Sequence, residues 1–243
     1  MKRYIHILLA AILLVGLLLP VSASAMPYKM HNTDISLQVD DTRWYVFTPD
    51  NILGNPELEE LGITYDWMKQ FFTDNNAYMD AILYYEDGNY IELFVRKKAT
   101  DSGVANLSNH NEKFINKVAK GAAEELGAED YSIYENQYKF IDIEYYDAEV
   151  ECYVCQYITI VNKDVYTVSF QASAPYTQEQ HQEMKEIVDS VRFTVDPTLK
   201  EEKDSSVGEA ALTGGIVGGA VGLIRAVMRK KKKKGQNQDT SVQ

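Results

Sequence analysis

Cysteine is scarce in this sequence, with two residues in a chain of 243. Two cysteines do not make the disulfide framework that stabilises small exported domains, so a packed apolar core must carry the stability. Cys152 and Cys155 form a C-x-x-C pattern, but they lie within a strand-like run, whereas redox C-x-x-C motifs sit at helix N-termini. Residues three apart on a strand point to opposite faces, so we expect buried thiols, with a disulfide or redox pair as the alternative.

The sequence also lacks the patterns that carry most catalytic and cofactor chemistry. It contains no G-x-S-x-G, no H-E-x-x-H, no phosphate loop and no zinc spacing, and its acidic pairs lack the order of a calcium loop. The histidines after residue 25, which are His31, His110 and His181, lie in polar contexts, and we expect all three at the surface. We therefore predict no catalytic residue, no metal site and no cofactor.

Basic residues are few between positions 26 and 208, where 34 acidic residues stand against 15 basic ones. A segment with a net charge of −19 should repel nucleic acid and anionic membrane surfaces, so we expect no nucleic-acid partner. The balance reverses from Arg225 onward, where there are seven basic residues and one acid. The run formed by Arg229, Lys230, Lys231, Lys232, Lys233 and Lys234 is expected to face anionic lipid.

The N-terminus has the three parts of a signal peptide. Lys2 and Arg3 precede an almost unbroken apolar run over residues 5–19, and Ala23-Ser24-Ala25 supplies the small residues that signal peptidase requires. We predict that residues 1–25 are cleaved after Ala25, with an uncleaved anchor as the alternative. No cysteine lies near the end of the apolar run, so a lipid-modified N-terminus is not expected.

A second apolar stretch lies near the C-terminus. Residues 209–228 are predicted to form a transmembrane helix, and residues 229–243 a basic cytoplasmic tail, as positive-inside topology requires. The helix spans about 28 Å at ~1.5 Å per residue if Arg225 extends toward the lysines, close to the hydrocarbon thickness. A soluble glycine-rich tail is the alternative. This topology predicts a single-pass protein of the cell membrane, expected to be bacterial, with its N-terminal domain outside.

The same helix has glycines in overlapping G-x-x-x-G spacings, which permit two helices to approach closely. These are Gly214, Gly215, Gly218, Gly219 and Gly222. This spacing favours self-association of the helix, so we expect the protein to form a homo-oligomer.

Between the two ends, residues 26–194 are predicted to form one extracytoplasmic domain, followed by a polar linker over residues 195–208. In its first half we expect short strands over 35–39 and 44–48 joined by a tight turn, a loop, and a helix over 64–72 with an apolar face. Two alternating runs over 78–85 and 89–96 predict a hairpin, and Asp87-Gly88 between them suits a type I′ turn.

The second half begins with a predicted helix over 109–126, capped by Ser108 and ended by Gly127. Four strands follow, over 132–136, 139–146, 150–161 and 165–174, the last expected to be half buried. Thr177 and Gln180 then form a capping box for a last helix. Hairpin-linked strands with helices between them predict the α+β class, with an antiparallel β-sheet packed between α-helices.

This order of elements resembles the PsbP-like superfamily, which includes photosystem II extrinsic proteins, bacterial DcrB-type envelope proteins and Ran-binding nuclear-import factors. The matching parts are the aromatic run WYVFTPDN, the central hairpin, the Ser108-capped helix and the closing unit VYTVSFQASAPYTQEQHQEMKEIVDSVRF. The resemblance covers residues 33–193 and implies an α/β/α sandwich and a non-enzymatic binding protein. DcrB-type members are typically lipid-anchored, whereas this chain has a C-terminal helix instead. No binding residue of the family is carried over.

Tyrosine is abundant, with 17 residues in the chain, many on or beside predicted strands. Strand propensity and a polar tip that reaches water explain most of them. The alternative is a surface of tyrosine and carboxylate, for example Asp142, Glu144 and Tyr146, that binds a protein or a glycan.

We therefore predict a membrane-tethered extracytoplasmic binding or interaction protein without catalytic activity, whose protein or glycan partner the sequence does not name. The alternative is a component of an oligomeric membrane assembly built through the glycine-rich helix.

Overall fold

Two antiparallel sheets carry the fold in the computed structural model, which describes residues 26–100 and 104–194. The larger sheet has seven strands in the order β3-β4-β5-β9-β8-β7-β6, and every neighbouring pair is antiparallel. With helices between the strand pairs, this confirms the α+β class. The strands are β3 (Tyr45–Phe47), β4 (Ala77–Tyr84), β5 (Tyr90–Ala99), β6 (Ser132–Glu135), β7 (Lys139–Asp147), β8 (Cys152–Val161) and β9 (Asp164–Ala172).

The smaller sheet has three strands in the order β1-β2-β10. They are β1 (Met26–Lys29), β2 (Ile35–Val39) and β10 (Arg192–Phe193). The two early strands of the sequence analysis are both present, but β2 and β3 belong to different sheets and do not pair. The turn between them closes with hydrogen bonds from the Arg43 and Trp44 amides to the Asp40 carbonyl, and it moves the chain from one sheet to the other.

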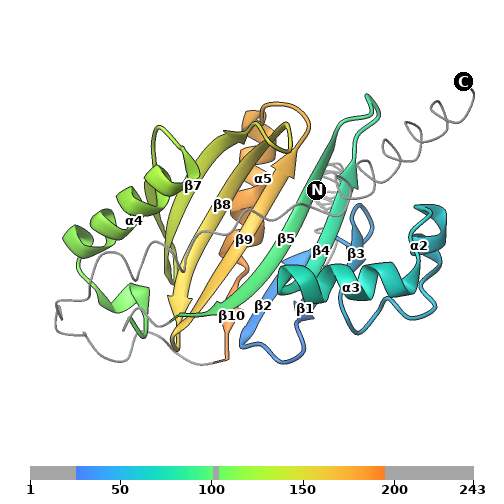
Figure 1. Ribbon diagram of the computed structural model, residues 1–243, viewed down its shortest axis with the longest axis horizontal. Coiled ribbons are helices and arrows are strands. Elements are labelled where there is room, and N and C mark those ends of the chain that lie inside the picture. The colour runs from blue at the N-terminus through green and yellow to red at the C-terminus, as the bar shows by residue number, and fades with distance from the viewer. Residues whose placement is uncertain (1–25, 101–103, 195–243) are drawn as a thin grey trace, which may run out of the picture.

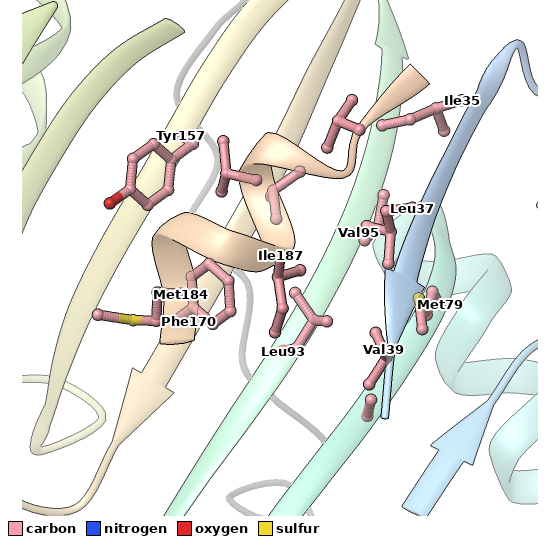
Figure 2. Packing of buried hydrophobic residues seen from close by; sticks show 14 of the residues in the cluster. Ile35, Leu37, Val39, Met79, Leu93, Val95, Tyr157, Phe170, Met184 and Ile187 are labelled. Carbon is pink, nitrogen blue, oxygen red and sulfur yellow. The ribbon is translucent and has the colours of Figure 1, made fainter. Parts of the chain in front are cut away.

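One face of the large sheet is covered by the small sheet together with α5 (Gln178–Asp189) (Figure 1). Strand β2 packs on β4 and β5, while α5 packs beside it on β8 and β9 (Figure 2). The side chains in this layer are Ile35, Leu37, Val39, Met79, Leu93, Val95, Tyr157, Phe170, Met184 and Ile187, all at most 6% exposed. Burying one large apolar side chain of this kind contributes roughly 1.5–3 kcal/mol, so this layer is a major source of stability.

The opposite face has one helix at each end (Figure 1). Helix α3 (Tyr65–Asn75) packs Met68, Phe71 and Phe72 with Phe94 of β5. Helix α4 (Glu112–Leu126) packs its alanine-rich face on the isoleucines of β7 and β8. Helices therefore lie on both faces of the sheet, with the small sheet as an additional element on one of them.

Several local predictions need correction. Helix α4 is capped by the Asn111 side chain, which accepts a hydrogen bond from the Phe114 amide, and not by Ser108, whose hydroxyl accepts from the Lys139 amide. Gly127 ends this helix with φ of 68°, as predicted. A short helix, α2 (Pro56–Glu60), occupies part of the predicted loop, since Pro at its first position is compatible with a helix start.

The type I′ turn is also in a different place. In the β4–β5 hairpin the Gly88 amide donates to the Tyr85 carbonyl, so the central residues of this turn are Glu86 and Asp87, and neither has positive φ. Gly88 follows them with φ of 83°, so Asp87-Gly88 is not the central pair of a type I′ turn. Between β8 and β9 both Asn162 and Lys163 have positive φ, of 53° and 67°. That pair has the backbone of a type I′ turn without a glycine.

Strand β9 was expected to be half buried, and this is wrong. Thr167, Ser169 and Gln171 alternate with its apolar residues as predicted, but all three are at most 4% exposed. The reason is position, because β9 lies at the centre of the seven strands, hydrogen bonded to β5 on one side and β8 on the other. An alternating pattern therefore indicated a strand here but not a solvent-facing side.

None of the described helices is long and apolar enough to cross a membrane. The predicted signal peptide, the linker, the glycine-rich helix and the basic tail all lie outside the described residues.

Asp80 is a buried acid beneath α3. Its side chain is 0% exposed, and its register partners Phe47 and Phe94 are also fully buried. Within the described residues no N–H or O–H group donates to either of its carboxyl oxygens. Burial, followed by the neighbouring carboxyl of Glu92, raises the pKa of Asp80 well above its usual range. Asp80 therefore keeps a proton that exposed aspartates have lost, and it can donate this proton to Glu92.

Asp80→Asn should flatten the pH dependence of stability. Because the folded pKa of Asp80 lies above the unfolded one, its contribution is present at low pH and is lost as pH rises from about 4 toward the folded pKa, by at most ~1.4 kcal/mol per pH unit. Denaturant unfolding of the full chain between pH 4 and pH 6 should show a smaller slope for Asp80→Asn than for the wild type. The exposed control Asp74→Asn should keep the wild-type slope, and equal slopes in all three would refute the assignment.

Candidate functional site

Helix α5 separates two surfaces on the face that it shares with the small sheet. Its start is fixed by a capping box, in which the Thr177 hydroxyl accepts from the Gln180 amide and the Gln180 side chain accepts from the Thr177 amide. Met184, Ile187 and Val188 then turn inward onto the sheet. The helix therefore presents one flank toward β6 and β7 and the other toward the β2–β3 turn and the β4–β5 hairpin.

The first flank contains the tyrosine–carboxylate surface considered in the sequence analysis. Asp142, Glu144 and Tyr146 alternate on β7 and therefore share one face. Glu144 lies 3.6 Å from the Nε2 atom of His181 on α5, and Tyr146, which is 53% exposed, packs its ring 5.0 Å from that of Tyr153. Glu144 and Tyr146 are thus open to solvent.

Asp142 differs from its two neighbours because it points into the structure. Its carboxylate accepts hydrogen bonds from the Ser132 hydroxyl at 3.3 Å and from the Cys155 thiol at 3.6 Å. Burial raises the pKa of Asp142, although both hydrogen bonds act in the opposite direction. The Asp142 side chain therefore links β7 to β6 and β8 and is poorly placed to contact a partner.

The two cysteines are free thiols in the interior. Cys152 and Cys155 are 0% and 1% exposed and form no disulfide, as the strand geometry predicted. Burial, followed by the charges of Asp142 and Glu144, raises the pKa of Cys155 well above its usual range. A thiol that holds its proton so firmly is a poor nucleophile, so Cys155 is a packing residue.

The histidines are only partly where they were expected. His31 is exposed and His181 is partly exposed, but His110 is 3% exposed and stacks on Phe114 with 4.2 Å between ring centroids. The prediction of a surface position is wrong for His110, because its ring packs against Phe114 in the first turn of α4. Among the described residues, no three His, Cys, Asp or Glu side chains are grouped so that they would hold a metal ion.

The second flank of α5 borders a groove that the sequence analysis did not identify. We call it the α5 groove, and it consists of two adjoining hollows of about 510 Å³ and about 680 Å³. The first has a partly apolar wall of Tyr85, Tyr90, Ala172, Ala174 and Pro175, with Asp87, Asn89, Thr177 and Gln180 around it. The second is lined by Gln178, Gln182 and Glu186. Arg43, Glu179 and Glu183 border both hollows.

An ion pair lies on the boundary between the two hollows. Arg43 of the β2–β3 turn binds Glu183 of α5 through two contacts, Nη1 to Oε1 at 2.9 Å and Nη2 to Oε2 at 3.4 Å. The buried indole of Trp44 donates from Nε1 to the same Oε1 atom at 3.2 Å. Because the Arg43 side chain is 50% exposed, the ion pair adds only about 0.2–1 kcal/mol to stability. Its main effect is to fix the position and charge of Glu183.

No local pattern in the sequence could have revealed this groove. Arg43 and Glu183 are 140 residues apart, and they meet because β2 and α5 lie side by side on the large sheet. The only hint was the capping box at Thr177, which located the start of α5 but not its neighbours.

No protein-family model matches the sequence, and no curated protein matches it.

Proposed function

We propose that the chain is a membrane-tethered extracytoplasmic binding protein without catalytic activity, and that the α5 groove is its binding face. The observation that carries the proposal is the pair of adjoining hollows, which three separate segments build around an ordered ion pair. Grooves with a few fixed polar groups and some aromatic wall are typical of binding sites.

The chemistry of the groove favours binding over catalysis. Its lining consists of carboxylates, amides, one arginine, two tyrosines and small apolar residues, with no His, Cys or Ser among them. The hydroxyl of Thr177, the remaining alcohol, already accepts a hydrogen bond as a helix cap. A nucleophile with an adjacent base, which acyl or phosphoryl transfer would require, is not part of this lining.

The fold supports the PsbP-like assignment as a proposal. An antiparallel sheet with helices on both faces matches the sandwich that the resemblance implies, and the small β1-β2-β10 sheet is an addition to it. Members of that superfamily tend to be binding proteins without enzymatic activity. The lining of the α5 groove likewise favours binding over catalysis.

The membrane tether rests on the sequence, namely on the signal peptide over 1–25 and the glycine-rich helix over 209–228 with its basic run. In this arrangement the described domain lies outside the membrane and is joined to the helix by residues 195–208. The glycine spacing also favours the alternative, an oligomeric membrane assembly built through that helix.

The topology predicts which engineered thiol a membrane-impermeant maleimide will label on intact cells. Since both native cysteines are buried and the Cys155 pKa is raised, the wild type provides an unlabelled background. Lys113→Cys, on the exposed side of α4, should be labelled, whereas Ser241→Cys should be labelled only after the cells are opened. Labelling of both variants on intact cells would contradict a cytoplasmic tail, and labelling of neither would contradict an external domain.

Photocrosslinking tests the groove as the binding face. A photoreactive residue in place of Gln182, on the groove side of α5, should give discrete crosslinked products in intact cells. The same residue in place of Asn116, on the exposed side of α4, is the matched control and should give none of these bands. Identical products from both positions, or products only from Asn116, would show that the α5 groove is not the binding face.

The assembly alternative predicts that the substitution Gly218→Leu will dissociate oligomers, because leucine keeps two backbones apart where glycine permits contact. Native gel electrophoresis after mild detergent extraction should then show a shift toward monomer. Oligomers that persist unchanged would rule out assembly through this glycine spacing and would leave the binding proposal untouched.

A further inference from the structure

We propose that the α5 groove binds a cationic segment of a partner protein, one that presents lysine or arginine side chains from an extended backbone. This inference rests on the proposed function, because it specifies the partner chemistry of the same groove.

The charge of the groove lining favours a cationic partner. Four carboxylates border the two hollows, those of Asp87, Glu179, Glu183 and Glu186, against the single guanidinium of Arg43. Arg43 is already paired with Glu183. Asp87, Glu179 and Glu186 form no ion pair within the part of the chain that the structure describes, so three negative charges remain to attract a cation.

The start of α5 opposes a cation only weakly. A helix N-terminus carries about half a positive charge, and its influence fades within the first turn. Glu179 lies in that turn and the Gln180 side chain already binds the Thr177 amide, so the exposed end of the helix is partly neutralised. Three carboxylates therefore outweigh the helix dipole, and an anionic ligand is disfavoured.

The wall of the smaller hollow also includes an aromatic side chain. Tyr85, which is partly exposed, borders this hollow, and the face of an aromatic ring attracts ammonium and guanidinium groups. The ring of Tyr90 is buried against Phe94 on the α3 face of the sheet and does not contribute.

The length of the groove sets the size of the segment that it can hold. Residues 178–186 of α5 follow the groove over about 12 Å, at ~1.5 Å per residue. An extended peptide advances ~3.3 Å per residue, so about four residues fit alongside. Two basic side chains of such a segment would then reach one hollow each, on either side of the Arg43–Glu183 pair.

The indole of Trp44 provides a reporter for binding, because it donates a hydrogen bond to Glu183 at the boundary of the hollows. The chain has one other tryptophan, Trp67 on α3, so Trp67→Phe leaves Trp44 as the single tryptophan, whose emission selective excitation separates from that of the tyrosines. In full-length protein in lipid nanodiscs, acetylated and amidated tetra-arginine should change the Trp44 emission saturably. Tetra-alanine with the same blocked ends should leave it unchanged.

Charge variants separate the groove from general attraction by an acidic domain. Glu179→Gln together with Glu186→Gln should weaken the binding of tetra-arginine about fivefold, as expected for two partly solvated ion pairs. Glu125→Gln with Glu129→Gln changes the net charge equally on the opposite side of the sheet and should alter the Kd less than twofold. Equal weakening by both double variants would overturn the proposal.

Arg43→Gln tests the same proposal with a change that should strengthen the binding of tetra-arginine. It removes the only cation of the lining, while Trp44 still holds Glu183 in place, so the binding of tetra-arginine should tighten about threefold. Unchanged or weaker binding would contradict the proposal, and a merely destabilised variant would not bind more tightly.

The tetra-arginine and photocrosslinking experiments together distinguish a failure of this inference from a failure of the proposed function. If tetra-arginine fails to bind while photocrosslinks from position 182 persist, the partner is not cationic and the groove remains the binding face. If tetra-arginine fails to bind and position 182 also gives no photocrosslinks, the α5 groove is not the binding face.

Discussion

The pairing of β5 with β9 is the interaction on which the rest of the structure depends. It runs from Ile91 opposite Ala172 to Ala99 opposite Asp164, and it is the only ladder between the two halves of the seven-stranded sheet. Everything between the two strands, from the turn after β5 to β8, must fold back for this ladder to form. Closing a loop of that length costs roughly 4 kcal/mol of chain entropy, so the apolar layers on both sheet faces must supply more than this.

Once that ladder is in place, the two covering layers follow. β2 lies over β4 and β5 from the first half, α5 lies over β8 and β9 from the second, and the two therefore meet above the β5–β9 ladder. The Arg43–Glu183 contact and the α5 groove lie where these layers adjoin. The groove is thus a consequence of sheet order rather than of any single motif.

Local chemistry explains how much of this could be predicted. The β4–β5 hairpin, the run from β6 to β9, Gly127 as a helix end and the Thr177 capping box all follow from patterns within a few residues. The errors concern features that depend on distant neighbours. The polar side of β9 is buried because of its central position, and β2 joins β1 and β10 rather than β3.

The same limit applies to the site. Asp142, Glu144 and Tyr146 were considered as one interaction surface, but only the structure shows that Asp142 points inward to Ser132 and Cys155. Asp80 gave no signal at all, since an aspartate in an alternating run resembles a solvent-facing residue until the partner strands are known.

Hydrogen exchange on the full chain in nanodiscs, with and without tetra-arginine, tests the central claim most directly. The account predicts slower amide exchange in two separate segments, the tip of the β4–β5 hairpin around Asn89 and the first turns of α5. It predicts no change along β7 beside Tyr146. Protection along β7 with none at α5 would place binding on the other flank of the helix and contradict the account.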